Sequence, residues 1–274
     1  MADTTSPFGT YSLNKREAQL LRWAQSMPVS WLGRRAALAF RKLVLMKNRP
    51  IVDAVADGMQ FRLYMNDNVS ERKYLFMPQF FDWYERKMLR RVLPEGGVFV
   101  DIGANAGVYT MTAAACVGAD GRVLAIEPNP AVLERLQFNA GLNGFLERVT
   151  VEQSCVGDTE GEVELSLDDS NLGGSSLVEQ RSTRKIIVPC RKLLDVVQGH
   201  NIARIDALKI DIEGAEDMAL IPFLQGAPQE LLPRLMIIEK SPSQWKGDLK
   251  SALKKAGYLL IETTRMNFVW ERAA

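Results

Sequence analysis

The spacing of apolar and polar residues changes character along the chain. Residues 15–46 show apolar positions at helical spacing, broken at Pro28-Val29-Ser30. Residues 51–55 and 59–64 then predict two short strands that turn at Asp57-Gly58. We therefore expect a helical N-terminal arm over residues 1–50, flexible in its first 14 residues, before a domain over residues 51–274.

Within that domain, a helix is expected at residues 80–93, and strands and helices alternate after it. Strands are expected at residues 98–102, 122–127, 149–156, 206–212, 234–239, 258–263 and 267–272. Helices are expected at residues 107–117, 130–141, 214–224 and 245–256. Such alternation is typical of a mostly parallel sheet covered on both faces. The final two strands have hairpin spacing, so the pattern predicts a Rossmann-like seven-stranded α/β sheet whose last strand is antiparallel. A further strand pair, at residues 162–167 and 186–190, is inserted.

Composition adds a charge asymmetry to this picture. The 274 residues carry a net charge of +1, which excludes a global basic field for nucleic acid. Residues 1–50 nevertheless hold nine Lys/Arg against two Asp/Glu. Residues 31–49 alternate apolar and basic positions, so they could lie on an anionic membrane surface. The alternative is an arm packed on the domain with its basic side chains in water.

The cysteines argue against a zinc site or a disulfide framework. Cys116, Cys155 and Cys190 are widely spaced, and His200 lies far from them in the sequence. The N-terminus lacks an apolar signal core, and no run of about 18 apolar residues is present. We expect a cytoplasmic protein, with a membrane surface as the other location that residues 31–49 suggest.

The stretch GGVFVDIGANAGVYT combines a carboxylate, a glycine-rich turn and a helix start. Asp101 ends a predicted strand, and Gly103 and Gly107 would let a ligand approach the backbone at the start of a helix. The next strand ends in Glu127, whose two oxygens suit a ribose diol. The pattern predicts a nucleoside cofactor at the carboxyl ends of these strands, the alternative being a tight turn without a ligand.

Two cofactors fit this outline. A dinucleotide would require glycine where the chain has Asn105 and Val108. S-adenosylmethionine carries an ammonium that suits Asp101 and has no phosphate to cradle. The sequence favours S-adenosylmethionine and leaves a dehydrogenase as a weaker alternative.

Eight segments, taken in order, resemble the FkbM-type methyltransferases. They are DNVSERKYL, VFVDIGANAGVYT, VLAIEPNP, SCVGDTEGEVELSL, GGSSLVE, IIVPCRKLLDVV, LKIDIEGAE and MIIEKS. The resemblance implies an S-adenosylmethionine-dependent O-methyltransferase acting on a hydroxyl of a sugar, glycolipid or secondary metabolite. One departure is that Lys240 and Ser241 follow Glu239, where the family often has an apolar residue and a histidine.

The resemblance also assigns the cofactor residues. It implies that the methionine end is held by Asp101, Gly103, Ala104, Asn105 and Gly107. It further implies that Glu127 holds the ribose beside Pro128 and Asn129, and that Ser154, Cys155 and Val156 edge the adenine.

Carboxylates at later strand ends are the candidate catalytic groups. Asp211 and Glu213 alternate around Ile212, and Glu239 ends the next strand. Clustered carboxylates repel, so one could carry a raised pKa and act as the base. They could also hold Mg²⁺, although no metal is expected. Glu213 has an alternative role at the following helix N-terminus, and Lys209 could pair with the acids or lie on the surface.

Further segments have two interpretations each. The aromatics of FMPQFFDWYE are expected to pack in the core rather than to line a substrate pocket. The loop with Ser175 and Ser176 is either a lid over the substrate or a plain turn, and His200 is expected to be a loop residue. The alternative to an enzyme is a cofactor-binding or membrane-associated accessory protein without turnover.

Overall fold

The fold is built on a central seven-stranded sheet. The computed structural model describes residues 2–46, 49–167, 172 and 184–272. In spatial order the strands are β11 (Tyr258–Thr263), β12 (Asn267–Arg272), β10 (Leu235–Glu239), β9 (Ala207–Ile210), β3 (Val98–Ile102), β4 (Arg122–Ile126) and β5 (Val149–Glu152). β12 runs antiparallel to both of its neighbours, while β10, β9, β3, β4 and β5 are parallel. The predicted Rossmann-like sheet with an antiparallel last strand is confirmed.

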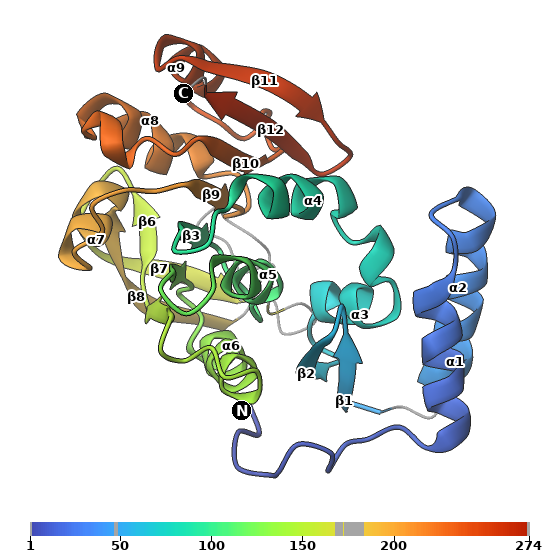
Figure 1. Ribbon diagram of the computed structural model, residues 1–274. Helices are drawn as coiled ribbons and strands as arrows, with labels where there is room; N and C mark the ends of the chain where they lie inside the picture. The colour runs from blue at the N-terminus through green and yellow to red at the C-terminus, as the bar shows by residue number, and fades with distance from the viewer. Residues whose placement is uncertain (1, 47–48, 168–171, 173–183, 273–274) are drawn as a thin grey trace.

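Helices cover both faces of this sheet (Figure 1). One face packs against α4 (Trp83–Val92), α5 (Val108–Val117) and α6 (Pro130–Leu142). The other face packs against α7 (Leu193–Gly199), α8 (Glu216–Gly226) and α9 (Leu249–Lys255). The strands therefore have apolar residues on both sides, which explains why they read as nearly continuous hydrophobic runs. The sequence analysis missed α7.

The predicted strand 149–156 is divided in the structure. β5 ends at Glu152, and a separate strand β6 (Cys155–Gly157) joins β7 (Gly161–Leu167) and β8 (Arg184–Lys192) in a three-stranded sheet. The strand expectation failed here because one apolar run serves two sheets, with Gln153 and Ser154 at the bend. β7 and β8 confirm the inserted pair, whereas Ser175 and Ser176 lie outside the described residues.

The N-terminal region contains a helical hairpin and a β-hairpin. The helices are α1 (Lys15–Ser26) and α2 (Trp31–Leu45), and the strands are β1 (Ile51–Ala56) and β2 (Met59–Tyr64). A further helix, α3 (Val69–Phe76), contacts both α1 and α2 and was not predicted. Buried side chains of α1 and α2 belong to the same apolar core as α4 and α5. Among the described residues, no helix is long and apolar enough to cross a membrane.

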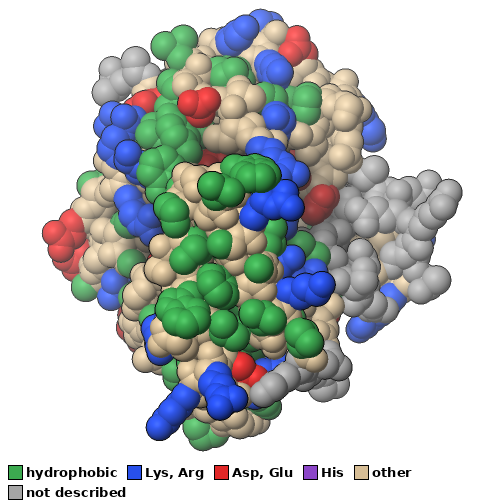
Figure 2. Space-filling view, turned by 90° about the vertical axis from the view of Figure 1, so that its right-hand side faces the viewer, with side chains coloured by type: hydrophobic (Ala, Val, Ile, Leu, Met, Phe, Trp, Pro, Cys, Tyr) green, Lys and Arg blue, Asp and Glu red, His purple; other side chains and the backbone are tan. Residues whose placement is uncertain are grey.

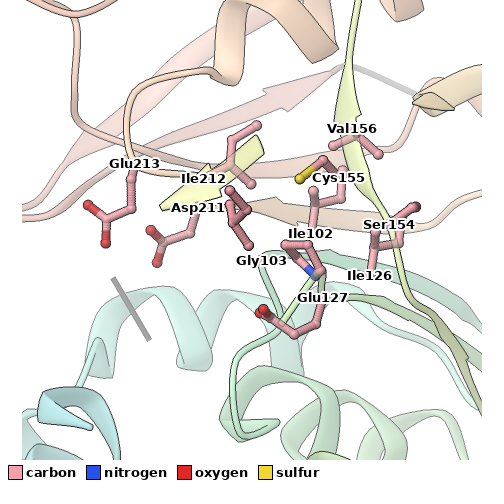
Figure 3. Close-up of a pocket in the computed structure, with 12 residues that line it drawn as sticks. Ile102, Gly103, Ile126, Glu127, Ser154, Cys155, Val156, Asp211, Ile212 and Glu213 are labelled. Atoms are coloured by element: carbon pink, nitrogen blue, oxygen red, sulfur yellow. The ribbon is translucent and has the colours of Figure 1, made fainter. Parts of the chain in front are cut away.

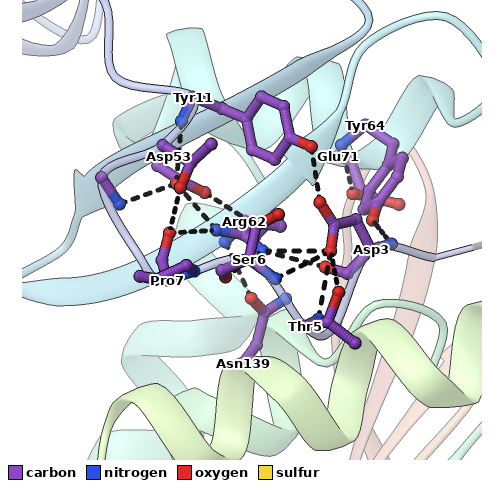
Figure 4. A network of polar contacts seen from close by, with 12 residues as sticks. Asp3, Thr5, Ser6, Pro7, Tyr11, Asp53, Arg62, Tyr64, Glu71 and Asn139 are labelled. Atoms are coloured by element: carbon purple, nitrogen blue, oxygen red, sulfur yellow. Dashed lines mark hydrogen bonds and ion pairs between the residues drawn. The ribbon is translucent and has the colours of Figure 1, made fainter.

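The first residues of the chain are held by a buried arginine (Figure 4). The Arg62 guanidinium donates to both Asp53 carboxylate oxygens, at 2.8 and 3.0 Å. It also donates to the backbone carbonyls of Asp3, Ser6 and Pro7 at 2.8–2.9 Å. The expectation of a flexible segment over residues 1–14 is therefore corrected for these residues. Nothing in the local sequence indicated that a distant arginine would bind them.

Candidate active site

A pocket lies at the carboxyl ends of β3, β4 and β9. It is lined by Ile102, Gly103, Ile126, Glu127, Pro128, Ser154, Cys155, Val156, Leu165, Asp211, Ile212 and Glu213. The space between these residues, including the part open to solvent, is about 510 Å³. Figure 3 shows the carboxylates of Glu127, Asp211 and Glu213 on one side and the apolar side chains with Cys155 on the other. The pocket is thus acidic at one end and apolar at the other.

The glycine turn after β3 is shaped by protein packing. Gly103 has φ +70°, and a Cβ there would lie 1.9 Å from the Asp211 carbonyl oxygen. Gly107 has φ +90°, and a Cβ there would lie 3.0 Å from Leu136. The role of these glycines in the approach of a ligand stays a prediction, and protein packing alone already requires them. Gly103 does line the pocket, but the close approach that excludes a side chain is that of β9.

All five backbone N–H groups of this turn have partners inside the protein. Those of Gly103 and Ala104 donate to the Ile126 carbonyl, and that of Gly107 donates to the Ala104 carbonyl. Those of Asn105 and Ala106 donate to side-chain oxygens. A phosphate cradle needs free amide donors in such a turn. The turn therefore does not have the form required for a dinucleotide pyrophosphate.

Glu127 is held rigidly at the rim of the pocket. Its Oε2 accepts the backbone N–H of Asn105 at 2.9 Å, and its Oε1 accepts that of Asn129 at 2.9 Å. Each oxygen keeps a second lone pair for a ligand hydroxyl. Burial raises the pKa of Glu127 to about 7, against the opposing effect of these two amides. Asn129 caps α6 through Ala131 N–H, so its side chain has a structural task.

The apolar end contains one unsatisfied polar atom. The Ser154 side chain is fully buried, and its Oγ has no hydrogen-bond partner among the described residues. Such an atom is costly unless a ligand or water completes it. Burial raises the pKa of the neighbouring Cys155 thiol to about 12, which keeps it neutral. A flat apolar ligand with polar edges, such as a nucleobase, suits these surroundings.

Asp101 lies on the opposite face of β3 from the apolar end of the pocket. It is fully buried, and its Oδ2 accepts the Thr110 hydroxyl at 2.6 Å, whereas Oδ1 is unpartnered among the described residues. Lys209 is its cross-strand neighbour on β9 and donates to Asp211 at 3.0 Å. Burial opposes the charge of Lys209, but Asp211 and Asp101 raise its pKa overall. Lys209 is therefore a buried counter-charge and not a surface lysine.

The predicted catalytic carboxylates are brought together. Burial, followed by the like charge of Asp211, raises the pKa of Glu213 to about 7. Burial and the like charges of Asp211 and Glu213 raise the pKa of Glu239 to about 9. Glu239 does not line the pocket, but it lies close enough to Asp211 and Glu213 for their charges to raise its pKa. At neutral pH the cluster therefore contains carboxyls in different protonation states.

The role of helix-start acid belongs to a different glutamate. Glu216 Oε1 accepts the backbone N–H groups of Ile212 and Gly214, both at 3.1 Å. Glu213 itself has φ +56° and lines the pocket. The alternative role predicted for Glu213 at the N-terminus of α8 is thus filled by Glu216.

Sequence reasoning missed several residues at the site. The apolar walls Ile102, Ile126, Leu165 and Ile212 gave no signal, because a strand buried on both faces does not reveal which face a side chain takes. Asp82 was also missed. Burial, with the nearby charge of Glu85, raises its pKa to about 6, and Tyr109 donates a hydrogen bond to it at 3.2 Å.

Other predicted roles are structural. Phe76, Phe80, Phe81 and Tyr84 pack in or against the core, as expected for the FMPQFFDWYE segment, but Trp83 is 48% exposed and does not. His200 follows α7, where its Nε2 lies 2.9 Å from Glu152 Oε2. In the part of the chain that the structure describes, no group of three or more His, Cys, Asp or Glu is arranged to hold a metal ion.

Comparison with known protein families identifies the class of enzyme to which this chain belongs. The model of the methyltransferase FkbM domain matches residues 101–260, which include the turn, Glu127 and the carboxylate cluster. This chain belongs to the FkbM methyltransferase family. Membership confirms the predicted class of S-adenosylmethionine-dependent methyltransferases, in agreement with the closed amide groups of the turn.

One curated protein and several solved structures resemble this family member. Methyltransferase sdnD of Sordaria araneosa is 26% identical over 211 residues, which are 65% of this chain and 78% of that protein. An S-adenosylmethionine-dependent O-methyltransferase of Thermotoga maritima is 13% identical with a TM-score of 0.47, over 86% of this chain and 82% of that chain. A methyltransferase of Geobacter sulfurreducens is 14% identical with a TM-score of 0.44, over 96% of this chain and 98% of that chain.

Proposed function

We propose that this FkbM-family protein is an O-methyltransferase that acts on a hydroxyl group. The observation that supports it is a pocket that is apolar at one end and has a carboxyl of raised pKa, Glu213, at its acidic end. A hydroxyl must lose its proton during methylation, and a carboxylate whose pKa lies near neutrality is suited to accept it. The acceptor class that we propose is a sugar, a glycolipid or a secondary metabolite.

The residues present fit S-adenosylmethionine. Bound there, the cofactor supplies a methyl group on a sulfonium leaving group. Glu127 would accept the ribose hydroxyls, because its orientation is already set by two backbone amides. Ser154 would donate or accept at the adenine edge through its unpartnered Oγ. The methionine end would lie toward the turn at 103–107. Asp101 precedes this turn without lining the pocket, and its Oδ1 has no hydrogen-bond partner among the described residues.

The carboxyl groups of Glu239, Asp211 and Glu213 would have different roles in proton transfer. Glu239 holds its proton at neutral pH, since burial and like charges raise its pKa to about 9. Asp211 accepts a hydrogen bond from the buried Lys209 ammonium at 3.0 Å. Glu213, with a pKa of about 7, is the group best suited to take a proton from an acceptor hydroxyl. The protein otherwise contributes by aligning the acceptor and excluding water.

Titration calorimetry with S-adenosylmethionine tests the cofactor assignment. Glu127→Ala removes the acceptor for the ribose and should weaken binding by about 1–3 kcal/mol. The matched control is Glu152→Ala, because Glu152 also ends a strand of the sheet but bonds to Arg191 and His200, away from the pocket. Equal affinities for the two variants would contradict the role of Glu127.

Methyl transfer to an acceptor panel tests the rest of the proposal. Full-length protein with methyl-labelled cofactor is incubated with hydroxylated sugars, glycolipids and polyketide-like alcohols. Transfer to an oxygen, located by mass spectrometry of the product, is the expected result. Tight cofactor binding without transfer to any hydroxyl, or transfer to nitrogen or carbon instead, would contradict it.

A further inference from the structure

Large apolar side chains are exposed on the face formed by α1 and α2. They are Trp23, Val29, Trp31, Leu32, Leu43 and Met46, between 47% and 74% exposed. Figure 2 looks onto this side of the molecule, where hydrophobic side chains gather with basic side chains around them. Exposed apolar groups scattered singly need no explanation, but a gathering of this kind marks an interaction surface.

The same face is exclusively basic in its charge. The sequence between Glu17 and Asp53 contains no acidic residue but seven Lys/Arg. Arg34, Arg35 and Lys42 are exposed on α2, and within the described ranges none of them forms an ion pair. Arg35 instead stacks over the Trp31 ring at 4.9 Å. The face thus combines apolar side chains with unpaired positive charge.

The inner side of α2 is firmly packed, so its outer side is fixed in place. Gly33, Ala37 and Val44 are buried against the core. α2 contacts α3, which carries Lys73, and the charge of Lys73 offsets a small part of the rise in the pKa of Glu213. One helix therefore separates the exposed face from the acidic end of the pocket.

We propose that the α1–α2 face docks the protein on an anionic lipid surface. The apolar side chains would enter the boundary between headgroups and acyl chains, and the basic side chains would contact lipid phosphates. Trp23 and Trp31 suit this position, because tryptophan concentrates at membrane–water interfaces. Docking would bring the pocket, through α3, next to substrates held in the membrane.

A second copy of the chain is a poorer occupant of this face. A two-fold interface would oppose the face to itself and bring its unpaired arginines and lysines together. Like charges placed across an interface oppose association, whereas anionic headgroups neutralise them. The positive charge of the face therefore favours a negatively charged partner. Its many exposed apolar side chains favour a lipid surface as that partner.

Vesicle flotation with the full-length protein tests the proposal. Vesicles of phosphatidylcholine alone are compared with vesicles that contain about 30% phosphatidylglycerol. We expect binding to the anionic vesicles, loss of most of it between about 0.05 and 0.5 M salt, and little binding to phosphatidylcholine. Absence of binding to anionic vesicles at low salt would overturn the proposal, as would equal binding to both compositions.

Two variants with matched controls separate the apolar and basic contributions. Trp31→Ser with Leu32→Ser should reduce vesicle binding about tenfold. Its control is Ile187→Ser with Leu259→Ser, which removes equally exposed side chains (71% and 68%, against 68% and 71%) elsewhere. Replacing Arg34, Arg35 and Lys42 by Gln should also reduce binding about tenfold. Its control replaces three exposed lysines by Gln, namely Lys246, Lys254 and Lys255.

Further measurements keep the outcomes distinct. All variants should bind S-adenosylmethionine as the parent does, so loss of the proposed cofactor site would be recognised separately. Light scattering reports the mass of the protein in solution. If the Trp31 and Leu32 variant converts a dimer to a monomer and vesicle binding is absent, the face is a self-association surface and the lipid proposal is wrong.

Discussion

At the scale of single residues, Ser154 is the most informative side chain in the pocket. Its side chain is buried, and its hydroxyl has no hydrogen-bond partner among the described residues. The desolvation of that hydroxyl is therefore not offset by a hydrogen bond within them. A buried serine with a purely structural role usually has a hydrogen-bond partner within the protein. Because this hydroxyl faces the pocket, a ligand or a water bound there would complete it.

Ser154→Ala should therefore separate binding from stability. S-adenosylmethionine affinity is expected to fall by about 0.5–1.5 kcal/mol, while the melting temperature without cofactor stays the same or rises. Calorimetric titration and thermal unfolding measure the two quantities. A lower melting temperature with unchanged affinity would make Ser154 a structural residue instead.

Glu213 leads to a prediction about pH. A base must be deprotonated to work, and the pKa of Glu213 is raised to about 7 by burial and by Asp211. The rate of methyl transfer should rise as pH increases through about 7 and then level off, within the range where the protein stays folded. Glu213→Gln should lower the maximal rate about 100-fold or more and remove this rise.

Initial rates of methyl transfer measured between about pH 5.5 and 8.5 provide the profile. The matched control is Glu164→Gln, because Glu164 is exposed on β7 and pairs with Lys185 at 2.5 Å, away from the pocket. A profile for Glu213→Gln that keeps the rise through neutral pH would assign the base to another group.

At the scale of elements, β2 is tied to the start of the chain by Arg62. Its guanidinium bonds to Asp53 on β1 and to three carbonyls within residues 3–7, and its charge lies over Tyr11 and Phe138. The arginine is 1% exposed, so the ion pair is shielded from solvent. Such a pair is costly to break on one side.

Arg62→Leu should lower the free energy of unfolding by about 3–5 kcal/mol, because the Asp53 carboxylate is left buried without its cation. The paired change Arg62→Leu with Asp53→Leu should recover part of that loss. Urea unfolding followed by circular dichroism measures both. A single variant as stable as the parent would show that the ion pair contributes nothing.

At the scale of the whole molecule, the N-terminal arm and the rest of the chain share one core. Leu21, Ala24, Ala37 and Val44 are buried in the cluster that also contains residues of α4 and α5. Deletion of residues 1–49 would expose that apolar surface and remove the carbonyl partners of Arg62. The truncated protein should aggregate or melt well below the full chain, in thermal unfolding followed by light scattering. A cofactor-binding truncation with the parent melting temperature would show that the arm only docks.

The sequence predicted those parts of the site that lie close together along the chain. Glu127 follows the strand after Asp101, and strand ends meet at one edge of a parallel sheet. The place of Glu127 therefore followed from pattern, whereas that of Ser154 came from the resemblance to the FkbM-type methyltransferases. The burial of Lys209 followed from neither, because a lysine in an apolar run gives no sign of which charges will surround it.

What the sequence determined by itself is most strands of the central sheet and the order in which acids follow them, since local spacing and strand ends encode both. Only the tertiary structure decided which groups became neighbours. Gly103 is required by the approach of β9, and Asp82 joins the acids because α4 packs over the sheet from an earlier part of the chain. Burial and mutual charge arise only when distant segments meet, so the pKa values that suit this pocket to proton transfer belong to the fold.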